Sequence, residues 1–156
     1  KFIPTEYQPT PEKTNRRYPF ILTTGRILSQ YNVGAQTRRT ENNIWWEEDT
    51  LEIHPSDAEA QGIADKQWVS LASRKGEITL KATLSDRMAP GVVYTTFHHP
   101  DTGANVVTTE NVDWATSCPE YKVTAVSVTP ANHKSTWQMN YQDELLEYRK
   151  IAEPAE

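Results

Sequence analysis

Residues 67–84, QWVSLASRKGEITLKATL, decide the fold class. Two runs of strand-forming residues, 67–72 and 77–84, flank Arg74-Lys75-Gly76, a sequence typical of a tight turn. Every second residue of the later run is apolar, so one face of that strand is expected to be buried and the other solvated. The stretch therefore predicts an antiparallel hairpin.

Similar short runs lie on both sides of this hairpin. Further strands are expected over 18–24, 51–53, 92–97 and 121–129. One short helix is expected over 56–62, with Ser56 as its N-cap and Gly62 as its stop. A second, amphipathic helix is expected over 141–151. Many short strands with one small helix between them favour a β-barrel with a helical insertion over a parallel βαβ fold.

Composition excludes several classes of protein. With 156 residues, the chain has room for one domain, and its 37% hydrophobic content includes no apolar run long enough to cross a membrane. A net charge of -5 argues against nucleic acid as a partner, because phosphate neutralisation needs a basic surface. A single cysteine, Cys118, rules out an intramolecular disulfide and a cysteine-rich zinc site.

The ends of the chain differ from its middle. Residues 1–17 contain three prolines and no periodic apolar face, so they are expected to form an extended arm or linker. The sequence begins at Lys1 without methionine or a signal-peptide pattern, which leads us to expect a piece of a longer protein. The expected organisation is an arm over 1–17, a barrel over 18–130 and a tail with a short helix over 131–156.

The common catalytic motifs are absent from the sequence. Its six glycines form neither GxGxxG nor GxxxxGK[ST], and HExxH, CxxC and GxSxG do not occur. What remains is a set of polar residues at strand ends and in the irregular segment 26–49, where binding groups tend to lie.

The first polar set follows the opening strand. It consists of Thr23, Thr24, Gly25 and Arg26, followed by Thr37, Arg38 and Arg39 in the irregular segment. Glycine allows close backbone approach, threonine and freed N–H groups can hold phosphate oxygens, and arginine adds a charge-assisted contact. In an acidic chain, this predicts a local anion site. The alternative is an ordinary strand-end turn with solvated arginines.

Two more polar sets lie later in the chain. Phe97-His98-His99-Pro100-Asp101 and Asn105 could bind a metal, but adjacent side chains on an extended segment point to opposite faces. Hydrogen bonding of a heterocycle edge by histidine or asparagine is the more plausible function. The segment Pro119-Glu120-Tyr121-Lys122 opens the last strand and could also contact a ligand. The alternative to a binding function there is an ordinary exposed strand start with a Glu/Lys pair.

Cysteine and tryptophan side chains could also act in catalysis or in ligand binding. Cys118 is expected to be a small, partly buried hydrophobe, because a nucleophile would need a nearby base. Trp45, Trp46 and Trp114 could stack on a ligand, although aromatic residues are more often core or interface anchors.

Taken in order, several segments resemble one family. These are PFILTTGRILSQYNVGAQTRRT, the stretch from LEIHPSDAEAQG to VVYTTFHHP, ANVVT, and CPEYKVTAVSVT. They resemble the C-terminal molybdopterin-guanine-dinucleotide-binding domain of the molybdenum/tungsten oxidoreductases of the dimethyl sulfoxide reductase type, nearest to formate dehydrogenase catalytic subunits. The resemblance spans roughly residues 18–129 and rests on several pieces in the right order rather than on any single one.

The resemblance implies a fold and a binding role. The implied fold is a six-stranded double-psi β-barrel, and the implied cofactor is bis-molybdopterin guanine dinucleotide with molybdenum or tungsten. The implied cofactor-binding residues, matched position by position, are Thr24, Gly25, Arg26, Thr37, Arg38, His98, Asn105, Tyr121 and Lys122. Gln30-Tyr31-Asn32 departs from the family pattern, in which a histidine is often found.

The resemblance also implies what this chain lacks. The metal-ligating cysteine or selenocysteine and the catalytic histidine and arginine of the family lie in earlier domains, so no catalytic or metal-ligating residue is expected here. Iron–sulfur clusters and electron-transfer subunits would belong to the rest of the enzyme, which would interconvert formate and carbon dioxide. Its implied location is the cytoplasm, with the periplasm left open.

Three rival functions remain open at this point. The first is the same domain from a related molybdopterin oxidoreductase with another substrate. The second is a non-catalytic interaction module that docks a partner through the proline arm and the C-terminal helix. The third is a metal hydrolase centred on His98, His99 and Asp101.

Overall fold

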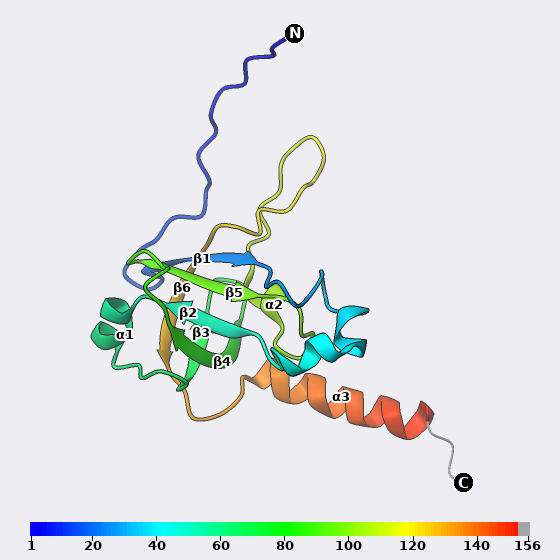
Figure 1. The fold of residues 1–156 in the computed structure, drawn as a ribbon. Helices are drawn as coiled ribbons and strands as arrows, with labels where there is room; N and C mark the ends of the chain where they lie inside the picture. Colours follow the sequence, from blue (N-terminus) through cyan, green and yellow to red (C-terminus); the bar gives the residue numbers. More distant parts are fainter. Residues whose placement is uncertain (153–156) are drawn as a thin grey trace.

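The computed structural model describes residues 1–152 and forms a closed six-stranded barrel with helices outside it (Figure 1). The strands are β1 (Phe20–Gly25), β2 (Thr50–Ile53), β3 (Trp68–Ala72), β4 (Glu77–Leu84), β5 (Val92–Thr96) and β6 (Thr124–Pro130). The helices are α1 (Pro55–Gln61), α2 (Ala104–Val107) and α3 (Thr136–Ala152), and two 3₁₀ turns are η1 (Thr37–Arg39) and η2 (Glu41–Ile44). The mainly β barrel that the sequence predicts is confirmed.

The strands close in the order β1-β5-β2-β4-β3-β6. β1 pairs parallel with β5, and β2 pairs parallel with β4, while the other neighbours are antiparallel. The predicted hairpin is β3–β4, with Leu71 opposite Ile78. Closure gives every strand two neighbours, which limits pairing of the barrel backbone with other chains.

Alternation along each strand fills the barrel interior. The fully buried side chains include Leu22, Leu51, Ile53, Leu71, Ile78, Val93 and Val126. They form one hydrophobic cluster to which each strand contributes. The 156-residue chain therefore contains a closed barrel with a core of its own, as an independently folding domain requires.

Helix α1 begins differently from the prediction. His54, rather than Ser56, is its N-cap, because His54 Nδ1 accepts a hydrogen bond from the Ser56 N–H at 3.2 Å. Pro55 then occupies the first helical position, where its missing N–H costs nothing. The predicted glycine stop is confirmed, since Gly62 adopts a left-handed conformation with φ of 66°.

Helix α3 is longer than expected and begins at Thr136 rather than at residue 141. Its first turn is fixed to β4 by Gln138, whose Oε1 accepts from the Thr79 N–H at 2.7 Å and whose Nε2 donates to the Thr79 carbonyl at 2.8 Å. On this side of β4, β2 pairs only with the residues from Lys81 to Leu84. The Gln138 side chain therefore supplies the hydrogen bonds that the Thr79 backbone would otherwise make to a neighbouring strand.

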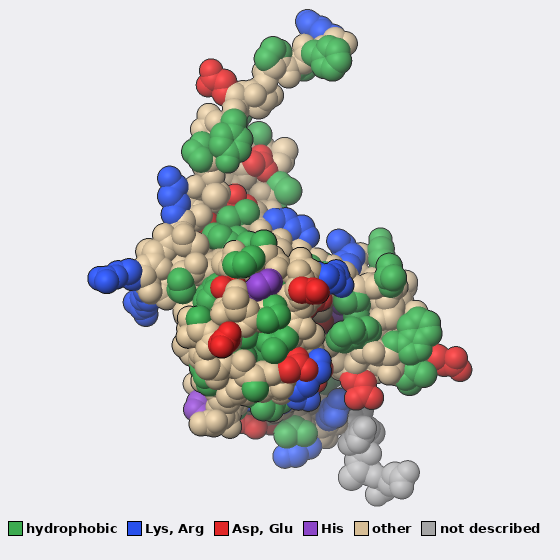
Figure 2. Space-filling view, turned by 60° about the vertical axis from the view of Figure 1, so that its left-hand side comes forward, with side chains coloured by type: hydrophobic (Ala, Val, Ile, Leu, Met, Phe, Trp, Pro, Cys, Tyr) green, Lys and Arg blue, Asp and Glu red, His purple; other side chains and the backbone are tan. Residues whose placement is uncertain are grey.

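The N-terminal arm lies outside the barrel. Glu12 anchors it, accepting hydrogen bonds from the Ala125 N–H at 2.8 Å and from Arg74 at 2.9 Å. Before that point the arm extends away, and Phe2, Ile3 and Tyr7 are exposed (Figure 2). The loop between α2 and β6 projects from the barrel on the same side (Figure 1).

Replacing Leu71 with alanine should lower the free energy of unfolding by about 2–5 kcal/mol, because a fully buried side chain is lost from a closed interior. Leu28 is fully exposed, so Leu28→Ala is the matched control and should change stability by less than about 0.5 kcal/mol. Urea denaturation followed by circular dichroism measures both. Equal effects at the two sites would contradict the assigned core.

Candidate functional site

The pairing register brings three distant segments to one end of the barrel. In the parallel pair β1–β5, Gly25 lies opposite Thr96, so both strands end at the same place. β6 runs antiparallel to β1, with Thr124 opposite Leu22, so the residues just before β6 return to that end. The predicted sets around Arg26, His98 and Lys122 therefore meet at the end of the barrel where β1 finishes, at Gly25. We call this the β1 end of the barrel.

Thr24 joins β1 to the turn before β6. Its side chain is buried, and its hydroxyl donates a hydrogen bond to the Tyr121 carbonyl at 2.8 Å. The Lys122 ammonium group in turn donates to the Thr24 carbonyl. Thr24 therefore uses its one hydroxyl proton within the chain, and its function is to hold the exposed Lys122 cation beside the end of β1.

Gly25 is required by the packing of Tyr94. A Cβ atom at Gly25 would lie 2.6 Å from the Tyr94 hydroxyl oxygen, so any other residue there would force the Tyr94 ring to move. Tyr94 donates a hydrogen bond to the Arg26 carbonyl at 2.8 Å. Burial, aided by the charge of Glu52, raises the pKa of Tyr94, so this hydroxyl keeps its proton.

Arg26 is a second exposed cation at the β1 end, beside Lys122. One guanidinium nitrogen donates to the Asn32 Oδ1 atom at 2.7 Å, and the guanidinium carbon lies 5.3 Å from the centre of the Phe97 ring. These two contacts hold the guanidinium group in one orientation. A fixed arginine with free N–H groups facing solvent can accept an anion such as a phosphate.

Thr37 and Arg38 lie in the irregular segment, in η1. The Thr37 hydroxyl donates to the Gln30 Oε1 atom at 2.6 Å and accepts from the Tyr31 N–H at 3.2 Å. Arg38 packs over Gly34, where a Cβ atom would lie 2.8 Å from the Arg38 Nε atom. Gly34 also has a positive φ of 69°, so both space and backbone conformation require glycine there.

His98 is fully buried, and both of its ring nitrogens are bonded within the chain. Its Nε2 atom accepts from the Ile27 N–H at 3.1 Å, so Nδ1 carries the hydrogen and donates to the Asn32 carbonyl at 2.5 Å. The ring thus clamps both ends of the segment from Ile27 to Asn32, and Asn32 holds Arg26. We find His98 placed to position that loop, with no ring nitrogen left for a ligand.

Asp49 is a buried acid that holds the residues around His98 in place. The sequence pattern does not predict it. Its carboxylate accepts hydrogen bonds from the backbone N–H groups of His98 at 3.2 Å and His99 at 2.9 Å, and from the Thr96 hydroxyl. The His99 Nδ1 atom lies 3.1 Å from Asp49 Oδ1. Asp49 precedes β2, so it ties the start of β2 to the end of β5.

Burial alone would raise the pKa of Asp49, but the hydrogen bonds from the His99 ring, the Thr96 hydroxyl and the His99 backbone outweigh it. The net effect lowers the pKa of Asp49 below its ordinary value of 3.8. Asp49 is therefore a carboxylate at neutral pH, and the facing His99 Nδ1 carries a hydrogen.

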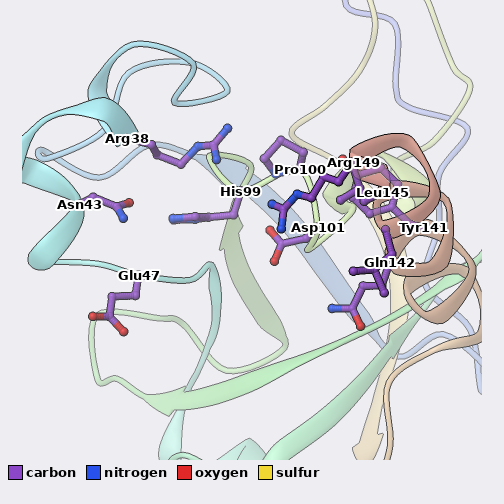
Figure 3. A pocket seen from close by; sticks show the side chains of 11 residues that line it. Arg38, Asn43, Glu47, His99, Pro100, Asp101, Tyr141, Gln142, Leu145 and Arg149 are labelled. Atoms are coloured by element: carbon purple, nitrogen blue, oxygen red, sulfur yellow. The ribbon is translucent and has the colours of Figure 1, made fainter. Parts of the chain in front are cut away.

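His99 forms part of the wall of a cavity. The cavity has a volume of about 750 Å³ and lies between the η1–η2 segment, the turn after His99 and helix α3. Figure 3 shows the His99 ring directed between Asn43 and Arg38, with the α3 side chains on the other side of His99. His99 was predicted as part of a heterocycle-binding set, whereas Asn43 carried no signal in the sequence.

Five other candidate residues lie in exposed positions. Asn105 is exposed in α2, and the described part of the chain shows no hydrogen bond between it and the other predicted site residues. Cys118 is exposed, which corrects the expectation of a partly buried thiol, because the loop from Asp113 to Cys118 turns around the Asp113 carboxylate and projects into solvent. Trp45, Trp46 and Trp114 are exposed as well.

Neither a metal-binding cluster nor a membrane span was found in the described chain. Among residues 1–152, no three His, Cys, Asp or Glu side chains are placed to hold a metal ion. The hydrolase alternative also meets an obstacle in His98, whose ring nitrogens are both engaged. Over the same residues, no helix combines the length and apolar character needed to cross a bilayer.

Comparison with known proteins identifies the family. The model of the family described as "Molydopterin dinucleotide binding domain" matches residues 20–125, so this chain belongs to that family. In solved structures, the barrel is similar to acetylene hydratase from Pelobacter acetylenicus, with a TM-score of 0.64 and 16% identity over 73% of this chain and 18% of that one. That likeness supports the fold alone.

Curated relatives come from two kinds of oxidoreductase. The chain is 40% identical over 129 residues to the F420-dependent formate dehydrogenase subunit alpha of Methanocaldococcus jannaschii, covering 82% of this chain and 19% of the relative. A formate dehydrogenase 1 subunit alpha of Methanococcus maripaludis is 40% identical over 124 residues, covering 79% and 18%. The assimilatory nitrate reductase catalytic subunit of Bacillus subtilis is 35% identical over 130 residues, covering 82% and 18%. The chain thus spans about a fifth of the length of these relatives.

Replacing Asp49 with asparagine should lower the free energy of unfolding at pH 7 by roughly 2–4 kcal/mol, because several buried donors lose a charged acceptor. Asp49 has a lowered folded-state pKa, so its contribution is present above the ordinary value of 3.8 and is lost as the pH falls below it. The stability difference between the two proteins should therefore shrink below about pH 4. Urea denaturation across pH 2–7 measures it, and a difference that grows in acid would contradict the assignment.

Proposed function

We propose that this chain is the C-terminal cofactor-binding domain of the catalytic subunit of a molybdenum- or tungsten-dependent formate dehydrogenase. The enzyme would interconvert formate and carbon dioxide. The observation that carries the proposal is the 40% identity over 129 residues to a formate dehydrogenase subunit alpha, in a chain of the dinucleotide-binding family. The arrangement of cations at the β1 end supports it.

The residues of the β1 end fit a dinucleotide. A pyrophosphate is anionic and needs fixed N–H donors, and this acidic chain holds Arg26 and Lys122 at one end of the barrel. Arg26 is oriented by Asn32 and Phe97, so little side-chain freedom is lost on binding. Gly25 lets the backbone and Tyr94 pack closely behind the binding surface.

We assign the predicted residues different tasks. Arg26, Lys122, Tyr121 and Asn105 would face the cofactor, and Arg38 would approach it from η1. Thr24, Gly25, Thr37 and His98 would act by holding these groups, because their polar atoms or their space are used within the chain. When bound, the cofactor supplies the two-electron chemistry, whereas the protein binds it, orients it and tunes its electrostatics.

The proposal extends to the rest of the enzyme. The cofactor would be bis-molybdopterin guanine dinucleotide. The barrel of this chain would be of the double-psi type. The catalytic residues and iron–sulfur clusters would lie in other domains. The partners of this domain would be the remaining domains of the same subunit and the electron-transfer subunits. The proposed location of the enzyme is the cytoplasm. Within this chain, residues 1–17 would be an arm, 18–130 the binding barrel and 131–156 a tail that carries α3.

A second candidate function has one observation in its favour. The chain is also 35% identical over 130 residues to an assimilatory nitrate reductase catalytic subunit. The same domain could therefore serve a related molybdopterin oxidoreductase with another substrate. Assay of the whole subunit with formate and with nitrate distinguishes the two functions.

Replacing Arg26 or Lys122 with alanine should reduce the cofactor content of the purified catalytic subunit several-fold, because each change removes a charge-assisted contact to phosphate. Pterin content per subunit, measured by fluorescence after oxidation, is the readout. Lys134→Ala, which removes a cation from the loop between β6 and α3, is the matched control and should leave cofactor content unchanged. Full cofactor content in both Arg26→Ala and Lys122→Ala would contradict the proposed site.

A further inference from the structure

The loop between α2 and β6 ends in a tip that exposes an aromatic side chain. Trp114 is 96% exposed, although tryptophan is on average a largely buried residue. The chain on either side of the tip forms a narrow ribbon, in which Val112 pairs with Pro119 and the Asn111 carbonyl accepts from the Glu120 N–H at 2.9 Å. The loop projects from the barrel on the side of the N-terminal arm (Figure 1).

The Asp113 carboxylate holds this tip in one conformation. It accepts hydrogen bonds from the Thr116 hydroxyl at 2.6 Å, from the Thr116 N–H at 2.7 Å and from the Cys118 N–H at 2.7 Å. These bonds, that of the Thr116 hydroxyl above all, lower the pKa of Asp113 to about 2, so the acceptor is charged at neutral pH. Trp114 directly follows Asp113, and an aromatic group held on a fixed loop loses little conformational freedom when it binds.

The N-terminal arm extends the exposed apolar surface on this side of the barrel. The Thr10 hydroxyl donates to the Glu120 carboxylate at 2.8 Å and thereby joins the arm to the base of the loop. Before Thr10, the arm exposes Phe2, Ile3 and Tyr7. Scattered apolar side chains are normal on a protein surface, whereas a group of them on one projecting side is typical of an interaction surface.

We propose that the Trp114 loop and the arm dock on the preceding domains of the same catalytic subunit, with the Trp114 indole in an apolar pocket of those domains. The inference rests on the proposed function, in which further domains precede this chain. The chain covers only 19% of its formate dehydrogenase relative from Methanocaldococcus jannaschii, so the remaining domains of such a subunit are large. The nine residues before Thr10 span at most about 30 Å, so this tether keeps the preceding domains close to the loop at a high effective concentration.

Charge defines the rim of that pocket. Residues 108–120 carry three carboxylates, Glu110, Asp113 and Glu120, and neither lysine nor arginine. Even with Glu110 paired to Lys75, the loop is left acidic. Because docking surfaces are arranged with complementary charge, the pocket should be apolar at its centre and bordered by lysine or arginine, with an acceptor for the indole N–H.

Cys118 is a native probe of this docking, because it lies in the loop and is exposed. Its rate of alkylation by iodoacetamide can be compared between the 156-residue chain and the full catalytic subunit, by mass spectrometry of the peptide that contains it. Labelling should be at least about tenfold slower in the full subunit, because a covered thiol reacts only when the loop opens. Equal rates, or protection that appears only when electron-transfer subunits are added, would overturn the proposal.

Trp114→Ala tests whether the indole is the anchor. It should speed the labelling of Cys118 several-fold in the full subunit, because an aromatic anchor carries a large share of docking energy. In the 156-residue chain the same change should leave labelling unaltered, since Trp114 is already in solvent there. Trp45→Ala is the matched control, an exposed tryptophan outside the loop, and should leave labelling of the full subunit slow. Equal acceleration by the two variants, or none by Trp114→Ala, would contradict the proposal.

Cofactor content separates failure of this inference from failure of the function on which it rests. A full subunit that carries its pterin, but labels at Cys118 as fast as the 156-residue chain, would refute the docking surface and leave the cofactor-binding function intact. A native subunit that contains no pterin would contradict the proposed function, whatever the rate of labelling.

Discussion

The buried carboxylate of Asp49 is the group on which the geometry of the β1 end of the barrel depends. It accepts hydrogen bonds from the Thr96 hydroxyl, from two successive backbone N–H groups and from the His99 ring. Burying a carboxylate away from water costs free energy unless its oxygens accept hydrogen bonds. Here all of these donors come from the end of β5 and the residues just after it. The end of β5 is thereby fixed to the start of β2, and the two histidines that follow are directed to different sides.

Each histidine connects Asp49 to a different part of the structure. His98 clamps the segment from Ile27 to Asn32, and Asn32 orients Arg26. His99 lies in the wall of the cavity, which is also lined by α3, a helix held on β4 by the Gln138 amide. The barrel core supplies stability, while this small polar network determines where the binding groups lie.

The barrel itself could be predicted from the sequence because alternation and turn residues are local signals. The β4 strand was predicted over the same residues that form it, and the β3–β4 hairpin follows from Arg74-Lys75-Gly76. The start of α3 was missed because Gln138 is fixed by a tertiary contact to β4 rather than by apolar periodicity. Ser56 was a reasonable cap by composition, but His54 lies one residue before Pro55 and reaches the same N–H group.

The site was only partly predictable for a similar reason. The sequence predicts the segments containing Arg26, His98 and Lys122 as binding segments, and the fold brings them to one end of the barrel. Their polar atoms differ in how far they are used within the chain, which only the fold determines. Asp49 gave no signal, since Glu47-Glu48-Asp49 has the composition of a solvated acidic run. Its burial follows from pairing of β2 with β5, a contact between strands about forty residues apart.

The central claim is that the β1 end of the barrel receives the phosphates of a guanine dinucleotide. Mapping amide chemical shifts during titration with guanosine diphosphate tests it most directly. The largest shifts should fall on Thr24 to Arg26 and on Tyr121 and Lys122, with little change at the opposite end near α1. Shifts confined to the α1 end, or spread evenly over the surface, would contradict it.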